Sequence, residues 1–404
     1  MTKRLLVLGG SRQALRGLEQ ILDLGLELVV CDYDPSAPGF DLAHHTILAS
    51  VYHLDQCLPA IQEFHQKLPL DGVMCLACDV PHVVARIAQS LNLPGIPVDV
   101  ADLFVDKFAM KERLVASGIS VPPYAIVTAA QDLDELLEKW QMLVVKPVDS
   151  RGSKGVSILD DRGQAEWAFR HAKEMSPSGR VMAEKFLSGP QLSTESILCD
   201  GQAVTPALSD RCYEYLEKYK PFIVENGGDM PSRLSDEILD AVRALISSAS
   251  KALGVSRGIV KGDIVVHEGR PYVIELAARL SGGYFCTHQI PYSTGVKLVE
   301  ACARQALGER LEASDWHGKY ERFVSTRWLI PSPGVIESVP AASEICGLKG
   351  VLAFDSWVSA GDVVGGAENA AASVAMVQAT GNTRAEAIAA AQNALDAFTI
   401  SVKS

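Results

Sequence analysis

The first hundred residues alternate short apolar runs with segments of helical periodicity. The apolar runs are "RLLVLGG" (4–10), "LELVVCDYD" (26–34) and "DGVMCL" (71–76), and helical periodicity is clearest in 14–25 and 83–92. Strands separated by helices pair in parallel, and the helices cover the faces of the sheet. We therefore predict an N-terminal, doubly wound parallel-sheet domain, in which ligands lie beyond the carboxyl ends of the strands.

The loop after the first strand, Gly9-Gly10-Ser11, is a candidate seat for an anion or a substrate at a helix N-terminus. It lacks the third glycine of a dinucleotide fingerprint and the Lys-Ser/Thr pair of a P-loop. A tight strand-to-helix turn explains it equally well. Asp32, just past the second strand, also has two interpretations: it binds a ribose hydroxyl, or it caps a turn.

The pattern changes after the first hundred residues. The stretch "LPGIPVDV" (93–100) carries two prolines and a glycine, which interrupt the alternation and indicate a boundary. Beyond it, strand-like runs and a long helix around 236–253 predict an α+β region with antiparallel sheet. A final segment holds short strands, turns and one helix. We expect domains at 1–95, 96–320 and 321–404.

The charge balance narrows the choice of partners. The 404 residues include 49 acidic and 37 basic side chains, a formal net charge of −12. Nucleic-acid binding requires a concentrated basic surface, so we expect no nucleic-acid partner. No apolar run approaches the ~20 residues that cross a bilayer, and no signal-peptide cleavage site follows the N-terminus. We expect no membrane contact, a cytoplasmic location, and reduced, mostly buried cysteines.

Two lysines and a glycine-rich loop form the first group of candidate residues. Lys146 ends the apolar strand "LVVKP", and Lys107 lies on the helix "DKFAMK". A lysine emerging from a hydrophobic strand indicates an anionic partner, for which a phosphate is a good candidate. The loop "DSRGSKGV" (149–156), with Ser153 and Lys154, can close its backbone N–H groups around an anion. Taken alone, Lys107 could equally be a solvated lysine on a helix surface. The loop taken alone could equally be an ordinary connection between two strands of a hairpin.

The strand "VMAEKFL" (181–187) is a candidate for binding a nucleotide base. An adenine needs an acceptor for its amino group, backbone hydrogen bonds at its edge and apolar surface on its faces. Glu184, Lys185, Phe186 and Leu187 offer all three. A surface acid at a strand end is the other interpretation of Glu184.

The segment "GDIVVHEGRPYVIELAARLSGG" (262–283) predicts a β-hairpin that brings Asp263 and Glu275 together near one end of a sheet. Two carboxylates beside a phosphate site suit Mg²⁺ or Mn²⁺, which take oxygen ligands and share them with phosphates. Arg279 would add a permanent positive charge for an anionic intermediate or a transferred phosphoryl group. Each acid alone could equally be a surface carboxylate.

These motifs, in this order and over nearly the whole chain, resemble the ATP-grasp superfamily of ligases. The resemblance implies a preATP-grasp domain (1–95), an ATP-grasp domain (96–320) with subdomains 103–185 and 186–320 flanking an ATP cleft, and a small lid-like C-terminal domain (321–404). The last segment, above all "ATGNTRAEAIAAA" (379–391), is similar to that of biotin carboxylase and of purine-pathway carboxylating enzymes.

The resemblance also implies residue roles. Lys107 and Lys146 would contact the ATP phosphates, Asp263 and Glu275 would hold Mg²⁺, and Arg279 would stabilise an acyl-phosphate step. The base would be bound by Glu184, Lys185, Phe186 and Leu187. Two positions depart from the family pattern: Ala277 replaces the asparagine of Glu-x-Asn-x-Arg, and Gln191 replaces a ribose-binding glutamate and hydrogen-bonds more weakly than a charged acceptor.

The activity that the resemblance implies is ATP-dependent joining of a small carboxylate, such as an amino acid, to an amine, with release of ADP and phosphate. Ser281, Gly282, Gly283 and His288 are candidate substrate contacts beyond Arg279, and Glu225 is a candidate for an ammonium group. A structural histidine and a solvated loop acid are the alternatives for His288 and Glu225. Two other functions stay open: a carboxylase that activates bicarbonate, and a nucleotide-binding protein without catalysis. A homodimer is expected from the family.

Overall fold

The computed structural model describes residues 2–403. The N-terminal sheet has four parallel strands in the order β3-β2-β1-β4. The strands are β1 (Arg4–Leu8), β2 (Glu27–Asp32), β3 (His45–Leu48) and β4 (Gly72–Cys75). Helix α1 (Leu15–Leu22) joins β1 to β2, a 3-10 turn (Pro38–Leu42) joins β2 to β3, α2 (Leu54–Lys67) joins β3 to β4, and α3 (Pro81–Ser90) follows β4. The sheet confirms the predicted parallel α/β architecture, because all four strands run in the same direction.

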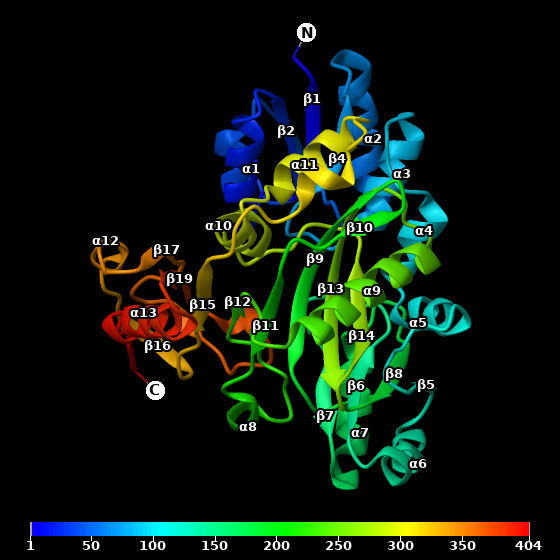
Figure 1. Cartoon of the computed structure of the whole chain (residues 1–404), viewed down its shortest axis with the longest axis vertical. Helices are drawn as coiled ribbons and strands as arrows, with labels where there is room; N and C mark the ends of the chain where they lie inside the picture. Colours follow the sequence, from blue (N-terminus) through cyan, green and yellow to red (C-terminus); the bar gives the residue numbers. More distant parts are fainter. Residues whose placement is uncertain (1, 404) are drawn as a thin grey trace.

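A helix from far along the chain completes this first layer. Helix α11 (Leu298–Ala306) packs against α1 and β4, and Figure 1 shows it lying across the N-terminal strands. A Cβ at Gly72 would lie 2.4 Å from the carbonyl oxygen of Ala306, so the helix approaches the sheet as closely as only glycine permits. A segment placed in the central domain by sequence therefore packs with the first domain.

A small antiparallel sheet follows, in the order β5-β8-β6-β7. Its strands are β5 (Tyr124–Val127), β6 (Leu143–Pro147), β7 (Ser157–Leu159) and β8 (Val181–Lys185), with helices α6 (Ala130–Trp140) and α7 (Ala165–Glu174). Helices α4 (Val98–Leu103) and α5 (Lys107–Ala116) lead into it, and the Asp106 side chain caps α5 by accepting from the N–H of Ala109 at 2.8 Å.

The largest sheet has nine strands, ordered β14-β13-β9-β11-β12-β15-β19-β17 with β10 beside β9, and all its pairs are antiparallel. The strands are β9 (Gln191–Cys199), β10 (Gln202–Val204), β11 (Leu208–Cys212), β12 (Gly227–Met230), β13 (Gly258–His267), β14 (Arg270–Ala277), β15 (Phe323–Leu329), β17 (Val351–Ser356) and β19 (Ala375–Gly381).

Helix α9 (Asp236–Leu253) shows how the sequence selects the packing of this sheet. Leu239, Val242, Ile246, Ala249 and Leu253 recur at helical spacing and are buried in one core with strands β13 and β14. Gly254 ends the helix with φ +88°, a left-handed conformation that glycine adopts without steric cost.

The C-terminal segment continues the large sheet instead of standing apart from it. Strand β15 pairs with β12 in register from Gly227 opposite Arg327 to Met230 opposite Val324. Across this junction Arg327 Nη1 lies 2.7 Å from Asp229 Oδ1, and both side chains are buried. Beyond it lie α12 (Ala342–Cys346), α13 (Arg384–Ala397) and a three-stranded sheet of β16 (Gly334–Ser338), β18 (Val363–Val364) and β20 (Ser401–Lys403).

Within residues 2–403, no helix combines the length and the apolar character needed to cross a membrane.

Candidate functional site

Two cavities meet where the small sheet faces the large one. The larger cleft has a volume of about 710 Å³ and lies between the N-terminal domain, β13–β14 and the C-terminal strands. The smaller cavity lies between the small sheet and the ends of β13 and β14. They share a wall made of Arg151, Gly152, Ser153, Arg211, Asp263 and Glu275. The two cavities are therefore adjacent, and the residues of this wall can contact a ligand in either one.

The smaller cavity gathers the residues that the ATP-grasp resemblance implied for the nucleotide and the metal. Its lining includes Lys107, Lys146, Ser153, Lys154, Glu184, Lys185, Phe186, Leu187, Gln191, Asp263 and Glu275. These residues come from α5, from both sheets and from the glycine-rich loop. The spacing of the motifs had predicted such a gathering, although the roles of the individual residues stay a prediction.

Glu184 is held by two lysines. Its Oε1 lies 2.5 Å from Lys146 Nζ and 3.0 Å from Lys111 Nζ, and all three side chains are almost completely buried. Burial alone would raise the pKa of Glu184, but the two ammonium groups outweigh it and lower that pKa. The carboxylate that was expected to accept from an adenine amino group thus already carries two ion pairs on Oε1.

Lys111 was missed by the sequence analysis. Burial lowers its pKa to about 8 despite the neighbouring Glu184, and its Nζ also donates to the carbonyl oxygen of Ile274 at 3.1 Å. The available signal was its position four residues after Lys107, which places both side chains on neighbouring turns of α5.

Asp263 and Glu275 lie directly opposite each other on β13 and β14. Asp263 Oδ1 is 2.5 Å from Lys261 Nζ and 3.0 Å from Arg211 Nη1, whereas Glu275 Oε1 is 3.2 Å from Lys107 Nζ. Burial would raise the pKa of Asp263, but Arg211 and Lys261 together lower it to about 2. The Asp263 carboxylate is therefore available in its ionised form.

The paired carboxylates fit a hard divalent cation, which prefers oxygen ligands. Between residues 2 and 403, no group of three or more His, Cys, Asp or Glu side chains converges on one point. The chain thus offers two carboxylates at this point and leaves the remaining positions to water or to phosphate oxygens.

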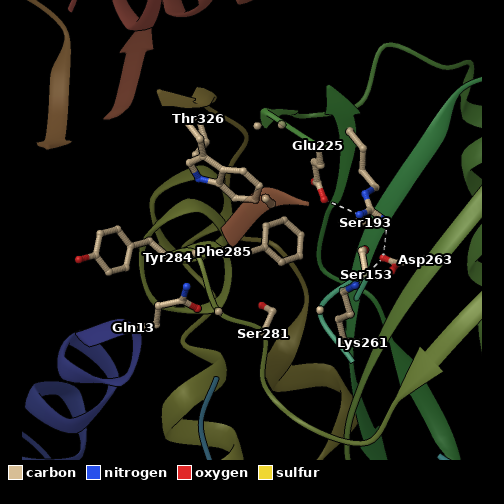
Figure 2. A pocket seen from close by; sticks show the side chains of 18 of the residues that line it. Gln13, Ser153, Ser193, Glu225, Lys261, Asp263, Ser281, Tyr284, Phe285 and Thr326 are labelled. Carbon is tan, nitrogen blue, oxygen red and sulfur yellow. Dashed lines mark hydrogen bonds and ion pairs between the residues drawn. The ribbon is translucent and has the colours of Figure 1, made fainter. Parts of the chain in front are cut away.

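Arg211 on β11 was also missed, and it changes the interpretation of Glu225. Arg211 lines both cavities and pairs with Asp263 and with Glu225. Glu225, predicted as a contact for a substrate ammonium group, lines the cleft but is bound to this guanidinium (Figure 2). The prediction overlooked it because the partner residue belongs to another strand, brought alongside only by folding.

Arg279 joins β14 to the N-terminal domain. Its Nε donates to the carboxylate of Asp79, in the loop after β4, and both residues line the cleft. Burial would lower the pKa of Arg279, but Asp79 raises it above its usual range, so the guanidinium stays charged. The Arg279 guanidinium therefore lies in the cleft, as predicted. Its contact with Asp79 could not be predicted from the sequence.

The loop of residues 281–284, which lines the cleft, is held in place by Glu195. The backbone N–H and the hydroxyl of Ser281 each donate to Glu195 at 2.7 Å. Glu195 is completely buried; burial raises its pKa to about 7, although the two bonds from Ser281 act in the opposite direction. Glu195 was not among the sequence candidates.

The two glycines of this loop lie close to side chains of other segments. A Cβ at Gly282 would lie 2.3 Å from Gln13 Oε1, and one at Gly283, where φ is +63°, would lie 3.1 Å from the Trp328 ring. Figure 2 shows Gln13, Tyr284 and Phe285 on the side of the cleft opposite Asp263. The predicted Ser281, Gly282 and Gly283 all line the cleft, since the loop passes along its wall.

His288 does not line the cleft, and this corrects its prediction as a substrate contact. Its Nδ1 lies 2.9 Å from Thr287 Oγ1 and its ring packs on Tyr284. Burial and the nearby Arg16 of α1 lower its pKa. The turn after Tyr284 directs His288 toward α1, and its neighbour Gln289 lines the cleft instead.

The loop after β1 resolves the two interpretations of Asp32. Asp32 Oδ2 accepts from the N–H of Gly10 at 2.7 Å and Oδ1 accepts from that of Asp34 at 3.1 Å, so it closes a turn. Arg12 and Gln13, which follow directly after the Gly9-Gly10-Ser11 loop, line the cleft.

Comparison with known proteins agrees with this arrangement. Residues 104–283 match the ATP-grasp domain, residues 19–95 the ATP-grasp N-terminal domain, and residues 327–403 the L-amino acid ligase C-terminal domain 2. A D-alanine–D-alanine ligase of Azoarcus sp. (strain BH72) is 31% identical over 230 residues, 54% of this chain and 70% of that protein. Dapdiamide A synthase of Enterobacter agglomerans is 25% identical over 277 residues, 64% of this chain and 62% of that protein.

Solved structures show the same fold. An L-amino acid ligase from Bacillus licheniformis superimposes with a TM-score of 0.85 at 22% identity, covering 100% of this chain and 99% of that one. A biotin carboxylase from Campylobacter jejuni gives 0.74 at 18% identity, covering 100% and 92%. The chain belongs to the ATP-grasp family of ligases. Its C-terminal segment carries, in addition, the domain of the L-amino acid ligases.

Proposed function

We propose that this ligase joins the carboxylate of one amino acid to the amine of a second, with conversion of ATP to ADP and phosphate. The observation that carries the proposal is the common wall of the two cavities, where Asp263, Glu275 and Arg211 face both a recess of about 130 Å³ lined by lysines and a cleft of about 710 Å³. The relatives named as D-alanine–D-alanine ligase and dapdiamide A synthase, and the match to an L-amino acid ligase domain, support amino acids as the substrates.

The smaller cavity would hold the nucleotide. Lys107 and Lys146 would face the phosphates, and the loop carrying Ser153 and Lys154 would close over them, because its glycines at 152 and 155 adopt positive φ angles that leave the backbone N–H groups accessible. Glu184 to Leu187 would line the base. Gln191, which accepts from the Tyr213 hydroxyl at 3.0 Å, would face the ribose.

Asp263 and Glu275 would hold Mg²⁺ or Mn²⁺ at the common wall. When bound, MgATP would supply the phosphoryl group that turns a carboxylate into an acyl phosphate. Arg279, fixed by Asp79, would neutralise the charge that develops as the amine displaces phosphate. No side chain is needed as a covalent nucleophile, since positioning and charge neutralisation account for this chemistry.

The larger cleft would hold both amino acids. One wall is charged and carries Arg211, Lys261 and Arg279 near the carboxylate pair. The other wall is apolar, with Phe285 and the C-terminal Trp328, Trp357 and Met376. We propose that the reacting carboxylate lies at the charged wall and that an apolar substrate side chain packs on the aromatic one.

The test is ADP release from MgATP with pairs of L-amino acids, followed by mass spectrometry. The expected product has the summed mass of two amino acids less one water, formed in step with ADP. ADP release that requires no second amino acid, or a condensed product that forms without ATP, would contradict the proposal. Lys146→Ala is the inactive control, and His288→Asn, outside the cleft, should retain activity within about threefold.

A homodimer and a cytoplasmic location stay predictions. Light scattering after size-exclusion chromatography tests the first, and cell fractionation the second.

A further inference from the structure

Lys261 occupies an unusual place for a lysine. On β13 it lies opposite Ala277 of β14 and opposite Glu195 of β9, two residues before Asp263. Side chains two residues apart on a strand point to the same face. Lys261 therefore stands on the same face as Asp263 and Glu275, one step along the sheet from the carboxylate pair.

A second metal ion beside the first would need ligands at that step. Two catalytic ions usually lie ~3.5–4 Å apart, and same-face positions along a strand are ~7 Å apart. The second ion would thus fall between the pair Asp263/Glu275 and the pair Lys261/Ala277. That second pair offers an ammonium group and a methyl group, and neither can bind a cation.

Strand β9, which pairs with β13 on its other side, offers few further ligands for a second ion. Ser193 of β9 lies opposite Asp263 and contributes only a neutral hydroxyl, while Glu195 is turned to Ser281 through both carboxylate oxygens. Lys261 Nζ itself lies 2.5 Å from Asp263 Oδ1, so the ammonium group already occupies one side of the carboxylate that a second ion would share.

The net charge of the smaller cavity also favours one divalent ion over two. Its lining includes six basic and three acidic side chains, an excess of three positive charges before Lys261 is considered. A bound triphosphate carries about four negative charges near neutral pH, and one divalent ion reduces this to about two. One ion therefore comes closer to neutrality than two.

We propose that this site binds a single divalent cation with the nucleotide, and that the Lys261 ammonium group takes the place and the charge of a second ion beside Asp263. The inference rests on the proposed nucleotide and metal site.

The experiment counts Mn²⁺ ions by electron paramagnetic resonance, with the non-hydrolysable analogue AMP-PNP held below the protein concentration so that all of it is bound. Binding of AMP-PNP without metal is measured separately by calorimetry. The wild-type chain is expected to hold one Mn²⁺ per bound nucleotide. Lys261→Gln, which replaces the ammonium group by a neutral amide oxygen, should bind a second Mn²⁺ at least roughly tenfold more tightly than the wild type does. Lys261→Arg, the matched control, should still hold one.

Two tightly bound Mn²⁺ ions in the wild type would overturn the proposal, as would a Lys261→Gln variant that binds Mn²⁺ like the wild type. If Lys261→Gln folds poorly, Lys261→Met, whose side chain offers no oxygen ligand, replaces it. Removing the ammonium charge should tighten Mn²⁺ binding at the first site several-fold. An affinity for Mn²⁺ equal to that of the wild type counts against the role of the lysine. If AMP-PNP fails to bind even without metal, the proposed nucleotide site is wrong and this inference falls with it.

Discussion

Asp263 and Glu275 face each other across two antiparallel strands, and each is bound by a different lysine, Lys261 and Lys107. The protein itself therefore holds the two carboxylates close together and pairs each with a cation, whichever ligand enters the site.

Glu275→Gln keeps the shape of the side chain but removes its charge. We expect ligation to fall by at least about 100-fold, because an amide is a weaker ligand for Mg²⁺ and no longer pairs with Lys107. The thermal midpoint should change little, since Glu275 is only partly buried. ADP release and differential scanning calorimetry measure the two effects. Activity within about threefold of the wild type would remove Glu275 from the metal site.

Lys146→Ala leaves Glu184 with Lys111 as its remaining lysine. Breaking a buried ion pair costs about 3–5 kcal/mol, so the free energy of unfolding should fall by an amount of this order, and AMP-PNP should bind at least about tenfold more weakly. Lys154→Ala in the exposed glycine-rich loop is the control. It should weaken nucleotide binding without a measurable change in stability, and equal stability losses in both variants would contradict this account.

Arg279→Gln removes the cation at the junction of the two cavities. We expect kcat to fall by about 100- to 1,000-fold, with AMP-PNP affinity within about threefold, because the charge is needed where the reaction occurs and not where the base binds. Asp79→Asn keeps the Arg279 guanidinium but holds it less firmly in position. The decrease in kcat should therefore be smaller than in Arg279→Gln. A variant of Arg279 that loses nucleotide affinity and rate together would place this residue in nucleotide binding instead.

Glu195 predicts a pH dependence of stability. Its pKa is raised from 4.5 to about 7 in the folded chain, so the folded state holds a proton that the unfolded state has lost. Folding is thus stabilised by this group below about pH 4.5, and the contribution is lost as the pH rises through about 7. Glu195→Gln should remove this loss, which is on the order of 3 kcal/mol.

Urea unfolding at pH 5 and pH 8 tests this expectation. The stability of Glu195→Gln relative to the wild type should increase between the two values. Glu321→Gln, at an exposed carboxylate, is the control and should show no such increase. An unchanged difference would mean that Glu195 is already ionised at pH 5.

The gathering of the proposed nucleotide residues around one cavity could be predicted because they stand in short motifs whose local chemistry is visible in the sequence. Lys146, the 149–156 loop and Asp263 with Glu275 are each explained by a strand, a turn or one hairpin. The parallel sheet followed from the same kind of local pattern.

The residues that were missed depend on contacts between distant segments. Arg211 reaches Asp263 only because β11 and β13 both flank β9, and Arg279 meets Asp79 across 200 positions of chain. Nothing near Glu225 or Glu195 in the sequence reveals the Arg211 or Ser281 that each contacts. His288 was placed in the cleft by its spacing after Arg279, whereas the turn at Tyr284 reverses its direction.

The pairing of β12 with β15 has a mechanical consequence. A hinge between the central and C-terminal parts would have to break backbone hydrogen bonds and the buried contact between Arg327 and Asp229. The C-terminal strands therefore form a wall of the cleft that stays fixed relative to the central sheet. The small antiparallel sheet is joined to that half by the isolated bridge between Ser157 and Phe222, so we expect opening for substrates to come from this sheet and its glycine-rich loop.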